Sequence, residues 1–462
     1  MPQDTLQTPG PSRIASAIRI AACISVAAAG LSHPANAVPA FAQQTGQPCA
    51  ACHVGAFGPQ LKPYGRDFKL RGYTAKDPAV AWRPPIAATV QTSFTHTKAD
   101  QPGGAARWFA PNNNVALDQA SLYYAGRMAP NLGAFIQVTY DGVGRVMHLD
   151  NADVRYAREF QIFDEDTDGF DLSAVGGITA NNSPTVSDLW NSTPVWGFPF
   201  NKSRLAPGPV ASALIEGQLG QRVAGTGGYA LFNDWVYTEF QLYRGLGRDV
   251  LNGTGIVPVS GAPRIEGLVP YWRVAVQHDW DHHSFEFGTY GMHAELYPNG
   301  DRSAGTTDSY TDAALDANYQ YIVNPDSVTS DMLSAHATWI NEQQNLNASR
   351  TIAASNGHNT LNSFRADVSY SFAATVTPSI QYFRTGGTAD ANFYGTPNGS
   401  PNSAGFIGEI AYVPFGKPDS LIQWGNIRFA LQYVAYTEFN GANRGASNND
   451  ALYLSVWFAT HF

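Results

Sequence analysis

The chain has 462 residues, of which 14% are charged and 12% are aromatic, and its net charge at neutral pH is −9. This mixture excludes a largely disordered chain, which would need more charge and fewer aromatic residues, and the acidic balance gives no support for nucleic-acid binding. A mean hydropathy of −0.22 excludes a bundle of membrane helices. It does not exclude membrane-spanning strands, in which apolar and polar residues alternate.

Residues 1–37 are predicted to be a cleaved secretory signal peptide. Two arginines precede a short apolar stretch from Ile20 to Leu31, and Ala35-Asn36-Ala37 provides a small-x-small cleavage site. The apolar stretch is too short to cross a bilayer. Cleavage would remove Cys23 and leave two of the three cysteines in the mature chain.

Cys49-Ala50-Ala51-Cys52-His53 has the attachment signature of a c-type haem. In such a motif the two thiols bond to the haem and the histidine binds the iron. The alternative is a disulfide between the two cysteines, but a redox Cys-x-x-Cys pair needs no histidine directly after it. We therefore predict one covalent haem c, with Cys49 and Cys52 as thioether residues and His53 as an axial ligand of the iron.

Residues 38–82 are predicted to form a small haem-bearing segment. Leu61, Tyr64 and Phe68 recur at helical spacing, which predicts one short helix that Gly65 weakens. The segment is rich in lysine and arginine. These residues form either a solvated helix face or a set of charges that face the haem propionates and an acidic lumen. About forty residues cannot bury a haem alone, so we expect the segment to plug the mouth of a larger structure.

The rest of the chain, residues 83–462, has the alternating pattern of β-strands that lie between lipid and a lumen. From Ile86 to Thr97, Ile, Ala, Val and Phe occupy one face, and Thr, Gln and Ser occupy the other. The runs 230–243 and 272–277 alternate in the same manner. The last strand is predicted to place Leu452, Leu454, Val456, Phe458 and Phe462 on one face.

Connections between the strands fall into two classes. Short runs such as 129–132 and 280–283 are typical of tight periplasmic turns, whereas the polar run 299–312 is typical of a longer extracellular loop. At roughly 22 to 26 residues per strand with its loop, the region holds about 14 to 18 strands, and we predict 16. The predicted fold is all-β: a transmembrane antiparallel β-barrel with a small N-terminal helical monohaem cytochrome c plug. The alternative is a soluble β-sandwich or propeller.

The distal ligand of the haem iron is not fixed by any motif. His336 and Met292 should both point inward according to the alternation of their strands, and both residue types bind haem iron. The alternative for each is an ordinary side chain of the lumen.

Two further segments suggest special roles. Asp164-x-Asp166-x-Asp168-Gly169 matches the start of a calcium loop, but its twelfth position is Val175 rather than glutamate. It is either a solvated acidic loop or a site for Ca²⁺ or Fe²⁺. The run Asn181–Phe200 is rich in aromatic and turn residues, so it is predicted to fold inward and pack on the haem. A self-packed outer loop is the alternative.

The chain resembles the fused cytochrome c–porin family of outer-membrane proteins, whose best-known members oxidise ferrous iron at the cell surface. The resemblance implies a 16-stranded barrel with one haem in an N-terminal plug, and it implies electron transfer more firmly than iron chemistry. The runs that carry it, besides the haem motif, are Pro39–Gly46, Phe68–Tyr73, Asn181–Val186, Asp188–Asn191, Pro194–Pro199, Gln432–Tyr433, Phe439–Gly441 and Ala446–Asn449.

These observations lead to a main functional hypothesis and three alternatives. The main hypothesis is a protein of the bacterial outer membrane, in contact with its lipid, that passes electrons between an extracellular donor and a periplasmic soluble cytochrome c or similar carrier. Fe(II) is the leading donor, which would make the protein a candidate Fe(II) oxidase. The alternatives are a haem-containing transport porin, a conduit for another donor, and a soluble secreted redox protein.

Overall fold

The computed structural model describes residues 39–80, 83–163, 171–256, 264–300 and 302–462. The predicted signal peptide and the acidic run from Asp164 to Asp168 lie outside these residues, so their predictions remain untested. The described helices near the N-terminus and the strands that follow belong to one compact unit.

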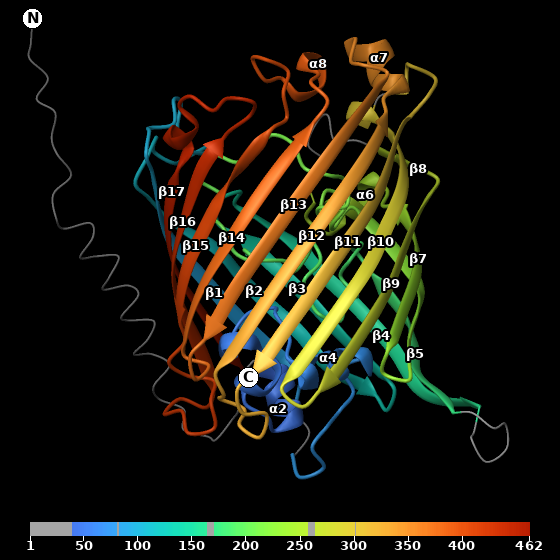
Figure 1. Ribbon diagram of the computed structural model, residues 1–462, viewed down its shortest axis with the longest axis vertical. Helices are drawn as coiled ribbons and strands as arrows, with labels where there is room; N and C mark the ends of the chain where they lie inside the picture. Colours follow the sequence, from blue (N-terminus) through green and yellow to red (C-terminus); the bar gives the residue numbers. More distant parts are fainter. Residues whose placement is uncertain (1–38, 81–82, 164–170, 257–263, 301) are drawn as a thin grey trace, which may run out of the picture. The chain divides into compact units, whose positions relative to one another are not determined.

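The strands form a closed antiparallel barrel (Figure 1). Each strand pairs with its neighbours in the chain, and the last pairs with the first, with Val90 opposite Phe458. β8 and β9 flank Gly267 and both pair with β10, so they count as one interrupted barrel strand. The described residues therefore build 16 barrel strands, as predicted. The bounds are β1 Ile86–Thr97, β2 Asn114–Ala129, β3 Leu132–Asp141, β4 Val146–Phe163, β5 Leu172–Asn181, β6 Val223–Phe232, β7 Val236–Gly245, β8 Arg264–Glu266, β9 Leu268–Trp280, β10 His283–Tyr297, β11 Asp308–Ile322, β12 Met332–Asn345, β13 His358–Ser371, β14 Val376–Gly387, β15 Ser403–Tyr412, β16 Gly425–Glu438 and β17 Ala451–His461.

The alternation in the sequence decides which side chains face outward. In β1 the polar face points inward and is buried, whereas Val90 is 39% exposed on the outer wall. Large apolar side chains continue around this wall, where a water-soluble protein would not expose them, and this is the pattern of a surface that faces hydrocarbon. They include Leu122, Ile178, Phe240, Leu242, Val274, Val276, Phe287, Leu315, Ile380, Phe406, Ile410, Leu431, Leu454 and Val456. No helix in the described part of the chain is long and apolar enough to cross a membrane.

The connections agree with the predictions in part. β2 ends at Ala129 and β3 begins at Leu132, and the turn between Trp280 and His283 is equally short. The run 230–243 contains a hairpin turn between β6 and β7. The predicted loop 299–312 was too long, because β11 already begins at Asp308 and its polar residues face the lumen.

Short helices close one end of the barrel. They are α2 Pro39–Thr45, α3 Cys49–Cys52, η2 Val54–Ala56 and α4 Pro63–Leu70, and Figure 1 shows α2 and α4 at the same end as the C-terminus. Pro63 occupies the first turn of α4, where a missing N–H costs nothing. The connections at the opposite end are longer and contain α6 Arg248–Gly253, η3 Pro298–Gly300, α7 Asn347–Ala353, α8 Ala391–Tyr394 and η4 Ala446–Asn449.

Candidate haem site and the filled lumen

The Cys-x-x-Cys-His motif forms one helical turn followed by an extended residue. Cys49 and Cys52 begin and end α3, so their side chains share one face of the turn. The backbone N–H of His53 donates to the carbonyl oxygen of Cys49 over 2.9 Å, and its φ of −111° and ψ of 140° end the helix. The two thiols are not joined in a disulfide.

The motif is buried against the barrel wall. Cys49 is 2% exposed, and Asn426, at the start of β16, donates from its Nδ2 to the Cys49 Sγ over 3.3 Å and to the Ala56 carbonyl oxygen over 2.8 Å. Burial raises the pKa of each thiol to about 12. The apolar cluster around Cys49 comprises Ala50, Ala56, Phe57, Ala374, Val413 and Ala459.

The ring of His53 is suited to binding a metal. Burial lowers its pKa to about 4, so the imidazole is neutral at physiological pH. Its Nδ1 is buried and has no hydrogen-bond partner among the described residues. Two unbonded thiols on one helical face, followed by a neutral histidine with an unpaired nitrogen, fit a covalent c-type haem. The described ranges contain no group of three or more His, Cys, Asp or Glu side chains that could hold a metal ion.

Gly65 allows α4 to pack directly on the motif. A Cβ atom at this position would lie 2.6 Å from the carbonyl oxygen of Cys52. The same oxygen accepts a hydrogen bond from the backbone N–H of Lys62 over 2.8 Å. The sequence identified Gly65 as a weak point of the helix; in the structure it is also the position where two segments of the plug make close contact.

The basic residues of α4 and its N-cap attach the plug to the barrel. The Lys62 Nζ donates to the carbonyl oxygens of Ala50 and Val328, each over 3.0 Å. Lys62, Arg66 and Lys69 are all buried. A solvated helix face is therefore the wrong interpretation for these three residues.

Arg66 is the central link on this side of the plug. Its guanidinium pairs with Asp279 and donates to the Gln320 Oε1 over 2.7 Å. It also lies 3.7 Å above the ring of Trp190. Through this one side chain, the plug contacts the barrel strands β9 and β11 and the run 181–200, which contains Trp190.

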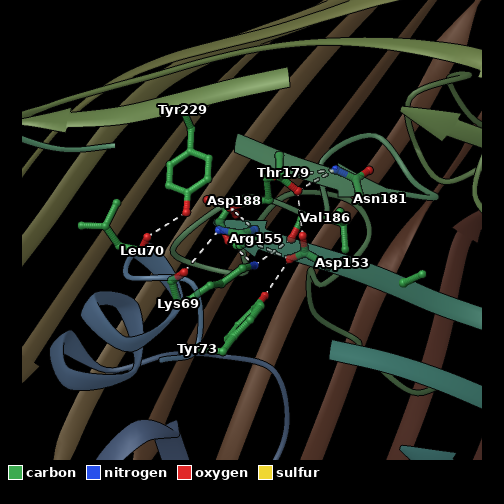
Figure 2. Close-up of polar contacts among 12 residues, drawn as sticks. Lys69, Leu70, Tyr73, Asp153, Arg155, Thr179, Asn181, Val186, Asp188 and Tyr229 are labelled. Carbon is green, nitrogen blue, oxygen red and sulfur yellow. Dashed lines mark hydrogen bonds and ion pairs between the residues drawn. The ribbon is translucent and has the colours of Figure 1, made fainter. Parts of the chain in front are cut away.

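Lys69 links α4 to the run 181–200 (Figure 2). Its Nζ donates to the carbonyl oxygens of Val186 and Asp188 over 2.7 and 2.6 Å, and to the Asn191 Oδ1 over 2.6 Å. Burial lowers its pKa to about 7. The carbonyl oxygen of Leu70, which α4 leaves unpaired at its end, accepts a hydrogen bond from Tyr229 over 2.9 Å.

The end of the plug is also held by a buried ion pair on β4 (Figure 2). The Asp153 Oδ2 accepts hydrogen bonds from the Tyr73 hydroxyl over 2.6 Å and from the Arg155 Nε over 2.8 Å. Arg155 in turn donates to the carbonyl oxygen of Ser187 over 3.1 Å. Plug, wall and loop thus share one polar network.

The run Asn181–Phe200 folds inward, as predicted, whereas its predicted packing on a haem stays untested. Leu189 and Trp190 are each 2% exposed, and the Asn191 Nδ2 donates to the carbonyl oxygen of Pro59 over 2.7 Å. Phe200 packs so closely on Gly58 that a Cβ there would lie 2.8 Å from its ring. The loop therefore rests on the plug and not on the outer surface.

Many side chains that face the lumen are buried. Inward-facing residues on widely separated strands are almost completely buried, including Gln241, Tyr271, Ser334 and Gln432 at 0 to 1% exposure. The walls of a water-filled pore would expose such polar residues to solvent. Gln241 donates to the Ser187 hydroxyl and Gln432 to the carbonyl oxygen of Asn201, so the connection between β5 and β6, and not water, covers these wall residues.

The two candidate distal ligands point inward but lie in different surroundings. Both ring nitrogens of His336 are engaged, Nδ1 with the Asp367 Oδ2 at 2.9 Å and Nε2 with the Ser334 Oγ at 3.3 Å. Met292 belongs to an apolar cluster with Leu214 and Tyr271. Neither residue shares a hydrogen bond or an apolar cluster with His53 among the described residues.

The chain is similar, at low sequence identity, to several solved outer-membrane porins. No protein-family model and no curated protein matches it. An anion-selective porin from Comamonas acidovorans is 11% identical with a TM-score of 0.43, and the match covers 81% of this chain and 98% of the porin. OprB of Pseudomonas putida is 10% identical with a TM-score of 0.43, covering 81% and 93%. OmpT of Vibrio cholerae is 10% identical with a TM-score of 0.42, covering 81% and 96%.

Proposed function

We propose that this protein transfers electrons through the outer membrane by means of one c-type haem held inside its barrel. The observation that carries the proposal is the placement of Cys49, Cys52 and His53 on a buried turn that is bonded to the barrel wall through Asn426. Cys49 and Cys52 would hold the haem by thioether bonds, and His53 would bind its iron. When bound, a haem c takes up and releases one electron at a time.

The surrounding residues would define the environment of the group. Asn426 orients the Cys49 sulfur, and Phe57 packs against Trp457 with ring centroids 5.2 Å apart. Such a dry shell excludes water and lowers the local dielectric, and both influence a redox potential. Lys62, Arg66 and Lys69 already have partners in the wall and loop, so their main role is to hold the plug in place.

The two ends of the barrel suggest the direction of contact. The end with tight turns and the plug corresponds to the periplasmic side of bacterial barrels, and the end with long loops corresponds to the extracellular side. We infer that a periplasmic soluble cytochrome or similar carrier meets the plug end. The donor, with Fe(II) as the leading candidate, would approach from the opposite end.

Spectroscopy of the detergent-purified protein tests this proposal. We expect covalently bound haem that survives denaturing electrophoresis, a c-type absorption spectrum, and reduction of the oxidised protein by Fe(II) under air-free conditions. His53→Ala should lose the native spectrum. Absence of covalent haem from protein made in cells competent for cytochrome c maturation would overturn the proposal, whereas a haem that Fe(II) does not reduce would overturn only the choice of donor.

A transport porin is the second candidate, and the barrel with its apolar outer wall favours it. Single-channel recording separates the two functions. The filled lumen predicts almost no conductance for the intact protein. Large, steady currents would favour transport and count against a sealed conduit.

A further inference from the structure

The connection between β1 and β2 carries an exposed tryptophan that contacts two arginines. The guanidinium carbon of Arg107 lies 4.5 Å from the centroid of the Trp108 ring, and that of Arg145, in the turn between β3 and β4, lies 4.9 Å from it. Both arginines are exposed, and Trp108 is 61% exposed. Cations are attracted to the face of an indole ring, so one ring holds two like charges close together at the surface.

The two connections are fixed to each other by an apolar cluster beneath this ring. Ala106 and Phe109 pack in one cluster with Val143, which belongs to the same turn as Arg145. Arg107 and Trp108 lie between Ala106 and Phe109 in the chain, and they stay on the exposed side of this packing. The arrangement of the two guanidinium groups is therefore set by the fold before any ligand binds.

Neither arginine has an anionic partner. Arg107 and Arg145 form no side-chain hydrogen bond or ion pair within the part of the chain that the structure describes. The carboxylates that lie near them in the chain have other partners: Asp141 pairs with Arg204, and Asp100 accepts a hydrogen bond from a neighbouring asparagine. Two positive charges that repel each other and lack a counter-charge favour an anion beside them.

This cluster lies next to the apolar outer wall, at the end of the barrel far from the plug. β1 begins beside the plug, where Ala87 shares an apolar cluster with Ala40, so the connection that follows Thr97 lies at the end opposite α2 (Figure 1). Val115, the second residue of β2, is 65% exposed on the outer wall and pairs with Phe94. A tryptophan just beyond the apolar end of a strand is typical of the level where lipid headgroups begin.

We propose that Arg107 and Arg145 bind a phosphate group of a lipid in the outer leaflet of the membrane. Guanidinium donors match the oxygens of a phosphate, and basic residues at a membrane surface attract anionic headgroups. The apolar wall around Val115 gives the acyl chains of the same molecule a surface to lie on, which a soluble anion would not use. Phosphorylated lipid A has this combination of groups. The proposal does not depend on a bound haem.

Native mass spectrometry of the detergent-purified full chain, mixed with equal amounts of phosphorylated and dephosphorylated lipid A, tests this proposal. The wild type should retain the phosphorylated form preferentially. The double variant Arg107→Gln/Arg145→Gln should bind it on the order of tenfold more weakly, because two basic contacts to an anionic headgroup are lost. Arg350→Gln/Arg444→Gln is the matched control, because both arginines are exposed in connections at the same end and their loss changes the net charge equally.

A third variant separates the geometry of the site from its charge. Trp108→Leu should also weaken lipid binding, although it changes no charge, because the ring that holds the two guanidinium groups together is lost. Heat-modifiable electrophoretic mobility verifies that each variant forms a folded barrel. Equal losses in the two double variants would indicate a general effect of charge and overturn the proposal, as would a wild type that retains both forms of lipid A alike. Displacement of the lipid by an equal concentration of inorganic pyrophosphate would indicate a site for soluble anions and overturn the choice of a lipid.

Discussion

Replacing Arg66 by leucine should loosen the plug while leaving the barrel intact. The change removes hydrogen bonds to the Gln320 Oε1 at 2.7 Å and to the Leu61 carbonyl oxygen at 3.2 Å, the pair with Asp279, and the contact with the ring of Trp190. The carboxylate of Asp279 is 46% exposed, so its ion pair contributes little. The two buried charged hydrogen bonds dominate, and the total cost is about 3 kcal/mol.

Hydrogen exchange of the α4 amides, measured by mass spectrometry in detergent, reports this loss. A cost of about 3 kcal/mol raises the equilibrium constant for local opening on the order of a hundredfold, and exchange should accelerate by the same factor. Arg71→Leu is the control, because Arg71 is partly exposed and pairs only with the exposed Asp67 and Glu159. It should change exchange by no more than a few-fold. Equal effects of the two variants would refute the assignment of Arg66 as the main link.

Three further predictions follow from the same contacts. Gly65→Ala should reduce covalent haem incorporation, because the added methyl group would lie 2.6 Å from the carbonyl oxygen of Cys52. Haem staining after denaturing electrophoresis measures this loss. The control Gly408→Ala should have no effect, because a Cβ at that position meets nothing within 4 Å. Burial lowers the pKa of Lys69 from its ordinary 10.5 to about 7. At a pH between these two pKa values, Lys69 is therefore neutral in the docked plug and protonated in the undocked plug. Plug docking should therefore strengthen as pH rises from about 7 towards 10.5, and Lys69→Met should flatten this trend in exchange rates corrected for intrinsic pH dependence. His336→Gln should leave the haem absorption spectrum unchanged, because both ring nitrogens of His336 already have protein partners; a changed spectrum would support His336 as the distal ligand.

The barrel could be predicted from the sequence because its signal is local. In β1 a period of two places polar side chains in the lumen and apolar ones against lipid, and this pattern does not depend on which strand pairs with it. The inward loop was predictable for a similar reason: residues 181–200 contain more aromatic side chains than a solvated loop would expose. The run 299–312 was misjudged because β11 carries many polar residues, among them Asp312, on a face that is buried in a filled lumen.

The partners of the plug could not be predicted, because they lie far away in the chain and carry no motif. Asn426 reaches Cys49 across 377 positions, and Gln320 reaches Arg66 across 254. A charge moved out of water is tolerated only if other groups replace its hydration, so three buried basic residues in the plug require oxygen atoms from the wall and loop. These oxygens include backbone carbonyls such as that of Val186, which no residue identity can reveal. The short plug therefore depends on the folded barrel for its burial, and substitutions at these distant contacts should affect the candidate haem site as strongly as substitutions within the plug itself.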